Sequence, residues 1–489
     1  MLNTMRYKEG FNKQQTTLMP KCLDEYIPQD HICRVIHAFT NNLNMHELGF
    51  KYAKPNQTGN KPYDPKMMLN LYIYGYTHKI RSSRLLQSET TKNLEVMWLL
   101  NELTPDDKTI ANFRSDNATA LKQTFKAFTI IINGLDLYSK ELIATDSVKF
   151  RANNSRKNNH NPTTLKTKIA HIDKQINEHL NTIEKNDQQE KENKEKDNNN
   201  QLSTEQRQEL LKKLNDKKVD FEKLLTIAEK EGQVSTIDPD ARLIHSGGDN
   251  RPLDVCYNTI TTTDAKHKLI VDFEVTNQAN DAGTLHAMSK KAKEVMGVER
   301  LCNLADKGFY DGEDIAACEA DGVTCLVAKP KVGGPKQSEG FSHEKFVYDQ
   351  ELDCYVCPCE QKLVFKGLYK RCGVLYRRYE NVVVCGVCLK RVQCTKLGFR
   401  MVFRSPYADV LDVVDRRTRD CGVFYRCRSV IVEHPFGVVK GVWGFKQFLC
   451  RGFVKVAGEV SLAFLAYNFR RVFNIFKADK ANLATVFCC

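Results

Sequence analysis

The sequence predicts an α/β protein, a mixed-sheet core interrupted by two insertions and preceded by an all-α domain. Three observations point to it: helix signals fill residues 1–140, strand patterns with embedded acids flank a long helical seam, and cysteines concentrate near the C-terminus. At 489 residues the chain suggests about three domains of roughly 150 residues. With 42% hydrophobic and 27% charged residues, it is neither a wholly disordered nor a fibrous protein.

The positive charge is concentrated in the last third of the chain. The whole sequence has 73 Lys and Arg against 60 Asp and Glu, a net charge of +13, whereas residues 354–489 contain 24 against nine, a net charge of +15. An excess of this size favours a polyanionic partner. The longest apolar candidate, residues 460–476, is broken by Asn468, Arg470 and Arg471, and the N-terminus has no signal-peptide core. We therefore expect a soluble, cytoplasmic protein without membrane contact.

Helix start signals recur in residues 1–140. Asp64 and Pro65 are the residue types of an N-cap and a first helical position. A second start is expected at Thr104, with Asp107 as the acid of a capping box.

The helix after Thr104 offers a candidate DNA reader. Its exposed side is expected to carry four polar residues, Lys108, Thr109, Asn112 and Arg114. A helix-turn-helix would place such residues in a DNA groove. A helical bundle with an ordinary polar face explains the same pattern equally well.

Strand and helix patterns alternate from residue 141 onward. We expect, in order, a strand over residues 141–151, a hairpin over 253–276, a helix over 284–297, strands over 300–306 and 323–330, and helices over 416–436 and 459–476.

Three acids occupy distinctive positions in this series. Asp146 lies inside the first apolar strand, Asp306 ends a later strand, and Glu433 lies on a late helix. A carboxylate in an apolar strand is costly unless it is paired or binds a metal. The order of elements is the one that an RNase H-like sheet requires to bring three carboxylates together. Oxygen ligands suit Mg²⁺, and two such ions roughly 3.5–4 Å apart can promote phosphodiester cleavage.

Residues 163–232 predict an inserted antiparallel helical hairpin, with a charged tip between its two helices. One apolar seam has helical spacing, and a second follows it: Leu165, Ile169, Ile172, Ile176, Leu180 and Ile183, then Leu210, Leu214, Phe221, Leu224 and Ala228. The hairpin is interpreted as a spacer, with a dimerisation or partner arm as the alternative.

Several segments, in this order, support a family resemblance: YDPKMMLNLYIYGY (63–76), IRSSRLL (80–86), TPDDKTIANFR (104–114), ATDSVKFRA (144–152), TIDPDARL (236–243), LADKGFYDGEDI (304–315) and IVEHPFGVVK (431–440). The chain resembles the DDE transposases of bacterial insertion sequences. The resemblance implies that Asp146, Asp306 and Glu433 are catalytic acids holding two Mg²⁺ ions, for which Mn²⁺ can substitute. It also implies that Lys440 contacts DNA phosphate. Tyr425 and Arg428 match the family's tyrosine and arginine before the glutamate and are also expected to contact DNA, although Arg428 lies one residue farther from the glutamate than usual.

The resemblance implies a domain plan. Residues 1–140 would be a DNA-binding helical domain; 141–162 and 233–330 the first part of an RNase H-like core; 163–232 the hairpin; 331–410 a basic cysteine-rich insertion; and 411–489 the rest of the core. Such an enzyme would cleave and join double-stranded DNA at the ends of its own element, as a homodimer in the bacterial nucleoid. A catalytically decayed DNA-binding protein is the alternative, and a zinc-stabilised scaffold is a third interpretation.

Twelve of the 18 cysteines follow residue 353, and their spacing predicts a structural Zn²⁺ site. Two CxxC pairs, Cys354/Cys357 and Cys385/Cys388, are typical of paired thiolate turns. Cys394 is a different fourth ligand, and the family resemblance favours the set Cys357, Cys385, Cys388 and Cys394, with Cys354 as the alternate. Reduced thiols without metal and an iron–sulfur cluster remain as alternatives. Lysines, arginines and tyrosines interleaved with these cysteines also suit binding to the DNA backbone.

Overall fold

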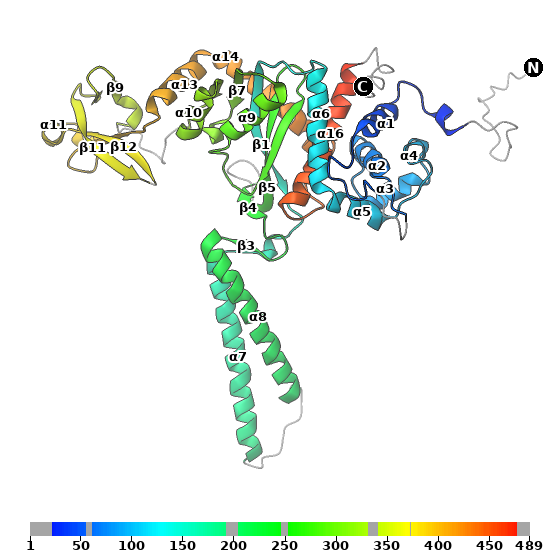
Figure 1. Ribbon diagram of the computed structural model, residues 1–489. Helices are drawn as coiled ribbons and strands as arrows, with labels where there is room; N and C mark the ends of the chain where they lie inside the picture. Colours follow the sequence, from blue (N-terminus) through cyan, green and yellow to red (C-terminus); the bar gives the residue numbers. More distant parts are fainter. Residues whose placement is uncertain are drawn as a thin grey trace, which may run out of the picture. The chain divides into compact units, whose positions relative to one another are not determined.

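The computed structural model describes residues 22–54, 61–191, 204–245, 253–330, 341–371 and 373–476. The chain forms two compact units: the first comprises Met1–Phe125 and Val460–Cys489, and the second Lys126–Glu459 (Figure 1). The sequence had assigned all of residues 411–489 to the core, but the segment from Val460 clusters with the N-terminal unit. Within the described residues, no helix combines the length and the apolarity that a membrane span requires.

The first unit is helical, as expected. Its helices are η1 (Leu23–Tyr26), α1 (Ile32–Asn42), α2 (Pro65–Thr77), α3 (Ser83–Thr90), α4 (Leu94–Leu99), α5 (Asp107–Asp116) and the beginning of α6 (Ala118–Gly134). Asp64 caps α2 by accepting from the Lys66 N–H at 2.8 Å, which confirms the expected start. The α5 cap is Asp106 rather than Thr104, because the Asp106 carboxylate accepts from the Thr109 N–H at 2.6 Å.

The core of the second unit is a six-stranded mixed sheet. Its strands are β1 (Leu142–Arg151), β4 (Arg242–His245), β5 (Leu253–Asp264), β6 (Ile270–Thr276), β7 (Leu301–Ala305) and β8 (Val323–Val327). They run in the order β4-β5-β1-β7-β8, with β6 also paired to β5. β1, β7 and β8 are parallel, whereas β5 is antiparallel to β1, β4 and β6. The sequence predicted each of these strands except β4.

Helices cover both faces of this sheet. α9 (Leu285–Met296), α10 (Gly312–Ala320) and α13 (Ala408–Asp420) share an apolar cluster with Ala305 and Val327. On the other face, α15 (Cys427–Phe436) packs Ile431 and Val432 against Ala144 and Leu304. Because successive strand residues point to opposite faces, the α15 face is the one to which Asp146 and Asp306 also belong.

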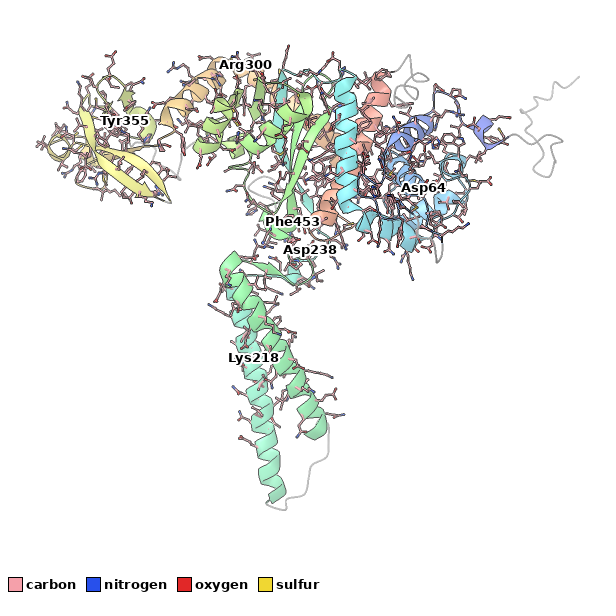
Figure 2. The ribbon with its side chains drawn as sticks, viewed as in Figure 1. Asp64, Lys218, Asp238, Arg300, Tyr355 and Phe453 are labelled. Atoms are coloured by element: carbon pink, nitrogen blue, oxygen red, sulfur yellow. The ribbon has the colours of Figure 1, made fainter. Side chains whose placement is uncertain are left out.

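The late helices differ from expectation. The single helix predicted over residues 416–436 is three helices, α13, α14 (Gly422–Tyr425) and α15, followed by the π-helix η5 (Gly437–Val442). The last helix, α16 (Phe453–Ile475), begins six residues before the predicted Glu459. Its start is set by a distant carboxylate, since Asp240 accepts from the Phe453 N–H at 3.0 Å. Asp238 accepts from the preceding N–H of Gly452 at 3.1 Å; Figure 2 labels Asp238 and Phe453.

The inserted hairpin is confirmed as α7 (Pro162–Lys191) and α8 (Thr204–Glu231), which lie side by side (Figure 1). Short strands β2 (Asn159–His160) and β3 (Val234–Ser235) pair at its base. Leu165, Ala228 and Val234 form a small buried cluster there, and Lys218 pairs with Asp173 at 2.6 Å farther along. Most of the expected charged tip, residues 186–200, lies outside the described residues.

The cysteine-rich insertion contains a second, antiparallel sheet that the sequence did not predict. Its strands are β9 (Val347–Asp349), β10 (Cys354–Val356), β11 (Lys362–Arg371), β12 (Val374–Glu380) and β13 (Met401–Arg404), with η4 (His343–Lys345), α11 (Val382–Gly386) and α12 (Arg391–Cys394) beside them. Phe346, Tyr355, Leu363, Tyr379 and Val402 form its core.

Candidate active site

Parallel pairing of β1 and β7 brings two of the three predicted acids together. Thr145 pairs with Ala305, so Asp146 is the next residue on β1 and Asp306 directly follows the end of β7. Adjacent strands lie about 4.8 Å apart, which places these two residues within reach of a common ligand. β7 ends at Ala305, and the Asp306 side chain accepts from the Lys307 N–H at 2.5 Å, which starts the short helix η3 (Lys307–Phe309).

α15 brings the third acid to the same face of the sheet. Ile431 and Val432 are buried against the strand residues two positions before the aspartates, and Glu433 follows them with an exposed side chain. Among the described residues, the three acids do not place three ligand oxygens within 4.8 Å of one another. Asp146 and Asp306 are close enough to influence each other's charge, whereas Glu433 lies exposed on the helix that covers them.

Two residues on the same side of the sheet, Tyr425 at the end of α14 and Arg428 on α15, contact the strands beside the aspartates. The Arg428 guanidinium donates to Oδ2 of Asp146 at 2.8 Å, and the Tyr425 hydroxyl donates to the carbonyl of Ala305 at 2.8 Å. Burial raises the pKa of Asp146, against the opposing effect of Arg428, and the nearby Asp306 carboxylate raises it further. Burial and the neighbouring carboxylate thus disfavour the charge of Asp146, and the Arg428 guanidinium partly offsets them.

Two family profiles match the chain. Residues 21–116 match a transposase domain, and residues 230–469 match a transposase DDE domain. The chain belongs to the DDE transposases of insertion-sequence type. Its mixed sheet, with β6-β5-β1-β7-β8 in spatial order and helices on both faces, is the RNase H-like core of that family. No curated protein and no solved structure shows significant similarity to this transposase.

Lys440 of the transposase lies against β1. Its ammonium group donates to the carbonyl of Lys149 at 2.8 Å and lies 5.8 Å from the Phe150 ring centre. Lys440 follows Glu433 by seven residues, which would be two turns of an unbroken α-helix, but α15 ends at Phe436 and a π-helix follows. A straight α-helical count therefore does not describe the relation of Lys440 to Glu433.

Sequence reasoning missed one acid beside this site, Asp281, in the loop between β6 and α9. Its carboxylate accepts from the Ser147 hydroxyl at 2.8 Å and from the Asn258 amide at 2.7 Å. Ser147 directly follows Asp146. The segment Asn280-Asp281 has the composition of an ordinary loop, so nothing local in the sequence distinguishes it.

Three other acids of the core, Asp264, Asp311 and Asp314, have structural roles. Asp311 caps α10 by accepting from the Asp314 N–H at 3.0 Å. Asp314 accepts from the backbone of Leu285 at 2.6 Å, at the start of α9. Asp264 is fully buried at its turn, where it accepts from the Ser139 hydroxyl at 2.6 Å.

The candidate reader helix α5 is only partly as expected. Lys108 and Asn112 are exposed. Arg114 is 6% exposed, donates to the Arg81 carbonyl at 3.2 Å and lies over the Tyr72 ring. The prediction that Arg114 shares the exposed face is wrong, because its long side chain folds back into the helical packing.

Five cysteines line a cavity of about 30 Å³ in the cysteine-rich insertion, enough for roughly one water-sized particle. They are Cys357, Cys359, Cys385, Cys388 and Cys394. The preferred set is thus gathered, but the alternate Cys354 is buried on β10 and does not line the cavity, whereas Cys359 does. The Cys359 N–H donates to the Cys357 sulfur at 3.4 Å, and burial raises the pKa of Cys359 and Cys394. In this structure no three of the five sulfurs lie within 4.8 Å of one another.

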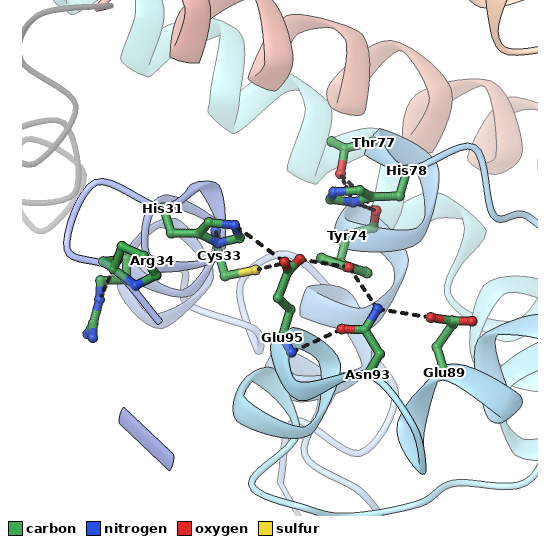
Figure 3. A network of polar contacts seen from close by, with 10 residues as sticks. His31, Cys33, Arg34, Tyr74, Thr77, His78, Glu89, Asn93 and Glu95 are labelled. Atoms are coloured by element: carbon green, nitrogen blue, oxygen red, sulfur yellow. Dashed lines mark hydrogen bonds and ion pairs between the residues drawn. The ribbon is translucent and has the colours of Figure 1, made fainter. Parts of the chain in front are cut away.

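A cluster in the helical unit has a metal-like composition. His31, Cys33 and Glu95 place one ligand atom each within 4.8 Å of the others (Figure 3). His31 Nδ1, however, accepts from the Cys33 N–H at 3.3 Å, so the neutral ring carries its proton on Nε2, which faces Glu95 at 3.5 Å. Tyr74 donates to the same carboxylate at 2.8 Å. The cluster is therefore a hydrogen-bonded tie between α1, α2 and α4.

Proposed function

We propose that this transposase binds the ends of its own insertion sequence and cleaves and joins DNA strands with Mg²⁺ held by Asp146, Asp306 and Glu433. The observation that carries the proposal is the β1–β7 register, which aligns the two aspartates beneath the helix that bears Glu433. The alternative is a catalytically silent DNA-binding protein.

The residues present fit a divalent metal. The donors are carboxylate oxygens, the hard ligands that Mg²⁺ prefers. When bound, Mg²⁺ or Mn²⁺ would supply Lewis-acid chemistry to a phosphodiester. The chain itself orients the aspartates: Tyr425 holds the end of β7, and Arg428 holds Oδ2 of Asp146.

DNA contact is assigned to three surfaces in this proposal. Lys108 and Asn112 on α5 would read element ends, and Lys440 beside β1 would contact backbone near the acids. The β11–β12 ribbon adds three exposed cations, all on β11: Lys366, Lys370 and Arg371. A two-stranded ribbon with such side chains suits a DNA groove or its phosphates. Because two element ends must be joined to target DNA, we expect a homodimer on DNA.

The cysteine cavity is proposed to hold one structural Zn²⁺. Its dimensions suit a single ion, and thiolates are ligands of choice for zinc. Because no three of the five sulfurs lie within 4.8 Å of one another, we expect them to move closer together when the ion binds. Purified, reduced protein should contain about one zinc per chain; neither zinc nor iron in elemental analysis would leave the thiols as unliganded core residues.

The transposase proposal is tested with a labelled duplex that carries the terminal repeats flanking the gene, beside a random duplex of equal length. Mg²⁺-dependent cleavage at the element end is expected. Binding of the end without cleavage, in Mg²⁺ and in Mn²⁺, would instead support the silent DNA-binding protein.

A further inference from the structure

Asp281 connects three parts of the core that meet beside the catalytic acids. Oδ2 accepts from the hydroxyl of Ser147 on β1, and Oδ1 accepts from the amide of Asn258 on β5. The Asp281 carbonyl also accepts from the Thr284 hydroxyl at 2.6 Å, just before α9. The carboxylate is thus held from both oxygens and from its own backbone.

The turn after Asp306 packs directly on the same carboxylate. A Cβ atom added to Gly308 would lie 3.2 Å from Oδ2 of Asp281, a tighter approach than a methyl group normally makes. Gly308 is two residues after Asp306, and Ser147 is one residue after Asp146. Asp281 therefore contacts the chain immediately downstream of both catalytic aspartates.

These contacts lie on the sheet face opposite the catalytic one. Ser147 alternates with Asp146, so its side chain points toward the α9 side. On that side Asn303 donates to Thr145 at 2.9 Å and to Ser289 at 2.8 Å, both in the buried interior. This buried polar network ties β1, β7 and α9 together, and the Asp281 contacts extend it to the ends of the strands.

The two donors to Asp281 are neutral side chains. They donate to both carboxylate oxygens and so hold the side chain in one orientation. Carboxylates and hydroxyls behind metal ligands typically orient those ligands, and their loss weakens metal binding.

We propose that Asp281 is a positioning residue that sets the separation of the Asp146 and Asp306 carboxylates and thereby the affinity for divalent metal. The inference rests on the proposed function, since it requires metal at those acids. Its alternative is a tie that stabilises the fold and leaves metal binding unchanged.

The test is a titration of the full-length protein with Mn²⁺, followed by electron paramagnetic resonance without DNA, alongside thermal unfolding in metal-free buffer. Asp281→Ala is expected to weaken site affinity about ten-fold. Ser147→Ala should weaken the Mn²⁺ affinity less. The double variant should bind Mn²⁺ no more weakly than Asp281→Ala, because both changes remove the same hydrogen bond between Ser147 and Asp281. In Gly308→Ala the added methyl group would lie 3.2 Å from Oδ2 of Asp281, so this variant should also lower the Mn²⁺ affinity. It replaces Asp281→Ala in the test if that variant fails to fold.

Asp311→Ala is the matched control, since it removes a carboxylate cap from α10 without touching Asp281 or its partners. It should lower the unfolding temperature and leave Mn²⁺ affinity unchanged. Wild-type affinity in Asp281→Ala, Ser147→Ala and Gly308→Ala would overturn the positioning role alone. If wild type and Asp146→Asn bind Mn²⁺ equally, no metal resides at the acids, and both this inference and the proposed metal chemistry fall.

Discussion

The two larger sheets of the second unit place their functional residues in opposite ways. In the core sheet, Asp146 and Asp306 become neighbours only because β1 and β7, far apart in sequence, pair in parallel. In the cysteine-rich sheet, the thiols come from short turns and helices close together in sequence, around β10, α11 and α12. The comparison shows that a site made by strand register depends on the whole core, whereas a site made by local turns depends on its own insertion.

Loss of a carboxylate at the site formed by the β1–β7 register should have the strongest effect on activity. Asp146→Asn, Asp306→Asn or Glu433→Gln should each lower strand cleavage by about 10³-fold, because loss of a metal ligand removes several kcal/mol of transition-state stabilisation. DNA binding should persist. Cleavage is measured on labelled element ends, with Asp311→Asn as the control that should retain activity. Wild-type cleavage by Asp146→Asn would remove it from the site.

Disrupting the cysteine site should destabilise only the cysteine-rich insertion. Cys385→Ser combined with Cys388→Ser should abolish bound zinc and increase amide hydrogen exchange in residues 341–404, because a closed thiolate site contributes folding energy to its surroundings. Exchange in β1 and β7 should not change. Mass-spectrometric exchange and elemental analysis measure both. Cys421→Ser, at an exposed position on the edge of α13, is the control; an unfolded core in the double variant would contradict local dependence.

Replacing Cys359 and replacing Cys354 should have different effects on zinc binding. Cys359→Ser should lower zinc affinity, because Cys359 lines the cavity, while Cys354→Ser should retain the metal. A competition titration with a zinc chelator measures the difference. The reverse order would show that metal binding rearranges β10.

The ion pair at the core site should give a pH-dependent effect on stability. Arg428→Ala should lower the free energy of unfolding by about 1–3 kcal/mol at pH 7, because a partly buried carboxylate loses its charged donor. Arg428 lowers the pKa of Asp146, so its removal raises that pKa further above the unfolded value of 3.8. An acid with a raised pKa destabilises the fold only where it is ionised, so the loss should shrink toward pH 4. Denaturant unfolding at both pH values checks this; an equal loss would indicate lost packing alone.

The same contrast of buried and exposed positions applies to α5, with a smaller effect. Arg114→Ala should destabilise the helical unit by about 1 kcal/mol, because it loses a hydrogen bond and ring contact. Lys108→Ala should leave stability unchanged and reduce the log–log salt dependence of DNA binding by about 0.9, if it contacts one phosphate. Thermal unfolding and binding at several salt concentrations separate the two. An unchanged salt slope would exclude Lys108 from the DNA interface.

Local chemistry in the sequence determined much of the architecture. Asp64 and Pro65 start α2 as their residue types require, and apolar spacing predicted the hairpin helices and most core strands. These features depend on neighbours a few residues away, whose geometry the backbone repeats. Asp146 and Asp306 were also identifiable, because a carboxylate in or beside an apolar strand is chemically conspicuous, whereas Glu433 was assigned from the family resemblance.

Other features of the protein depend on its tertiary structure. It starts α16 at a carboxylate from Asp240, buries Arg114, brings Cys359 rather than Cys354 to the thiol cavity, and places Asp281 behind the catalytic strands. Each depends on which distant segments become neighbours and how deeply they are buried. Register and burial arise when the whole core packs, and no local spacing in the chain contains that information.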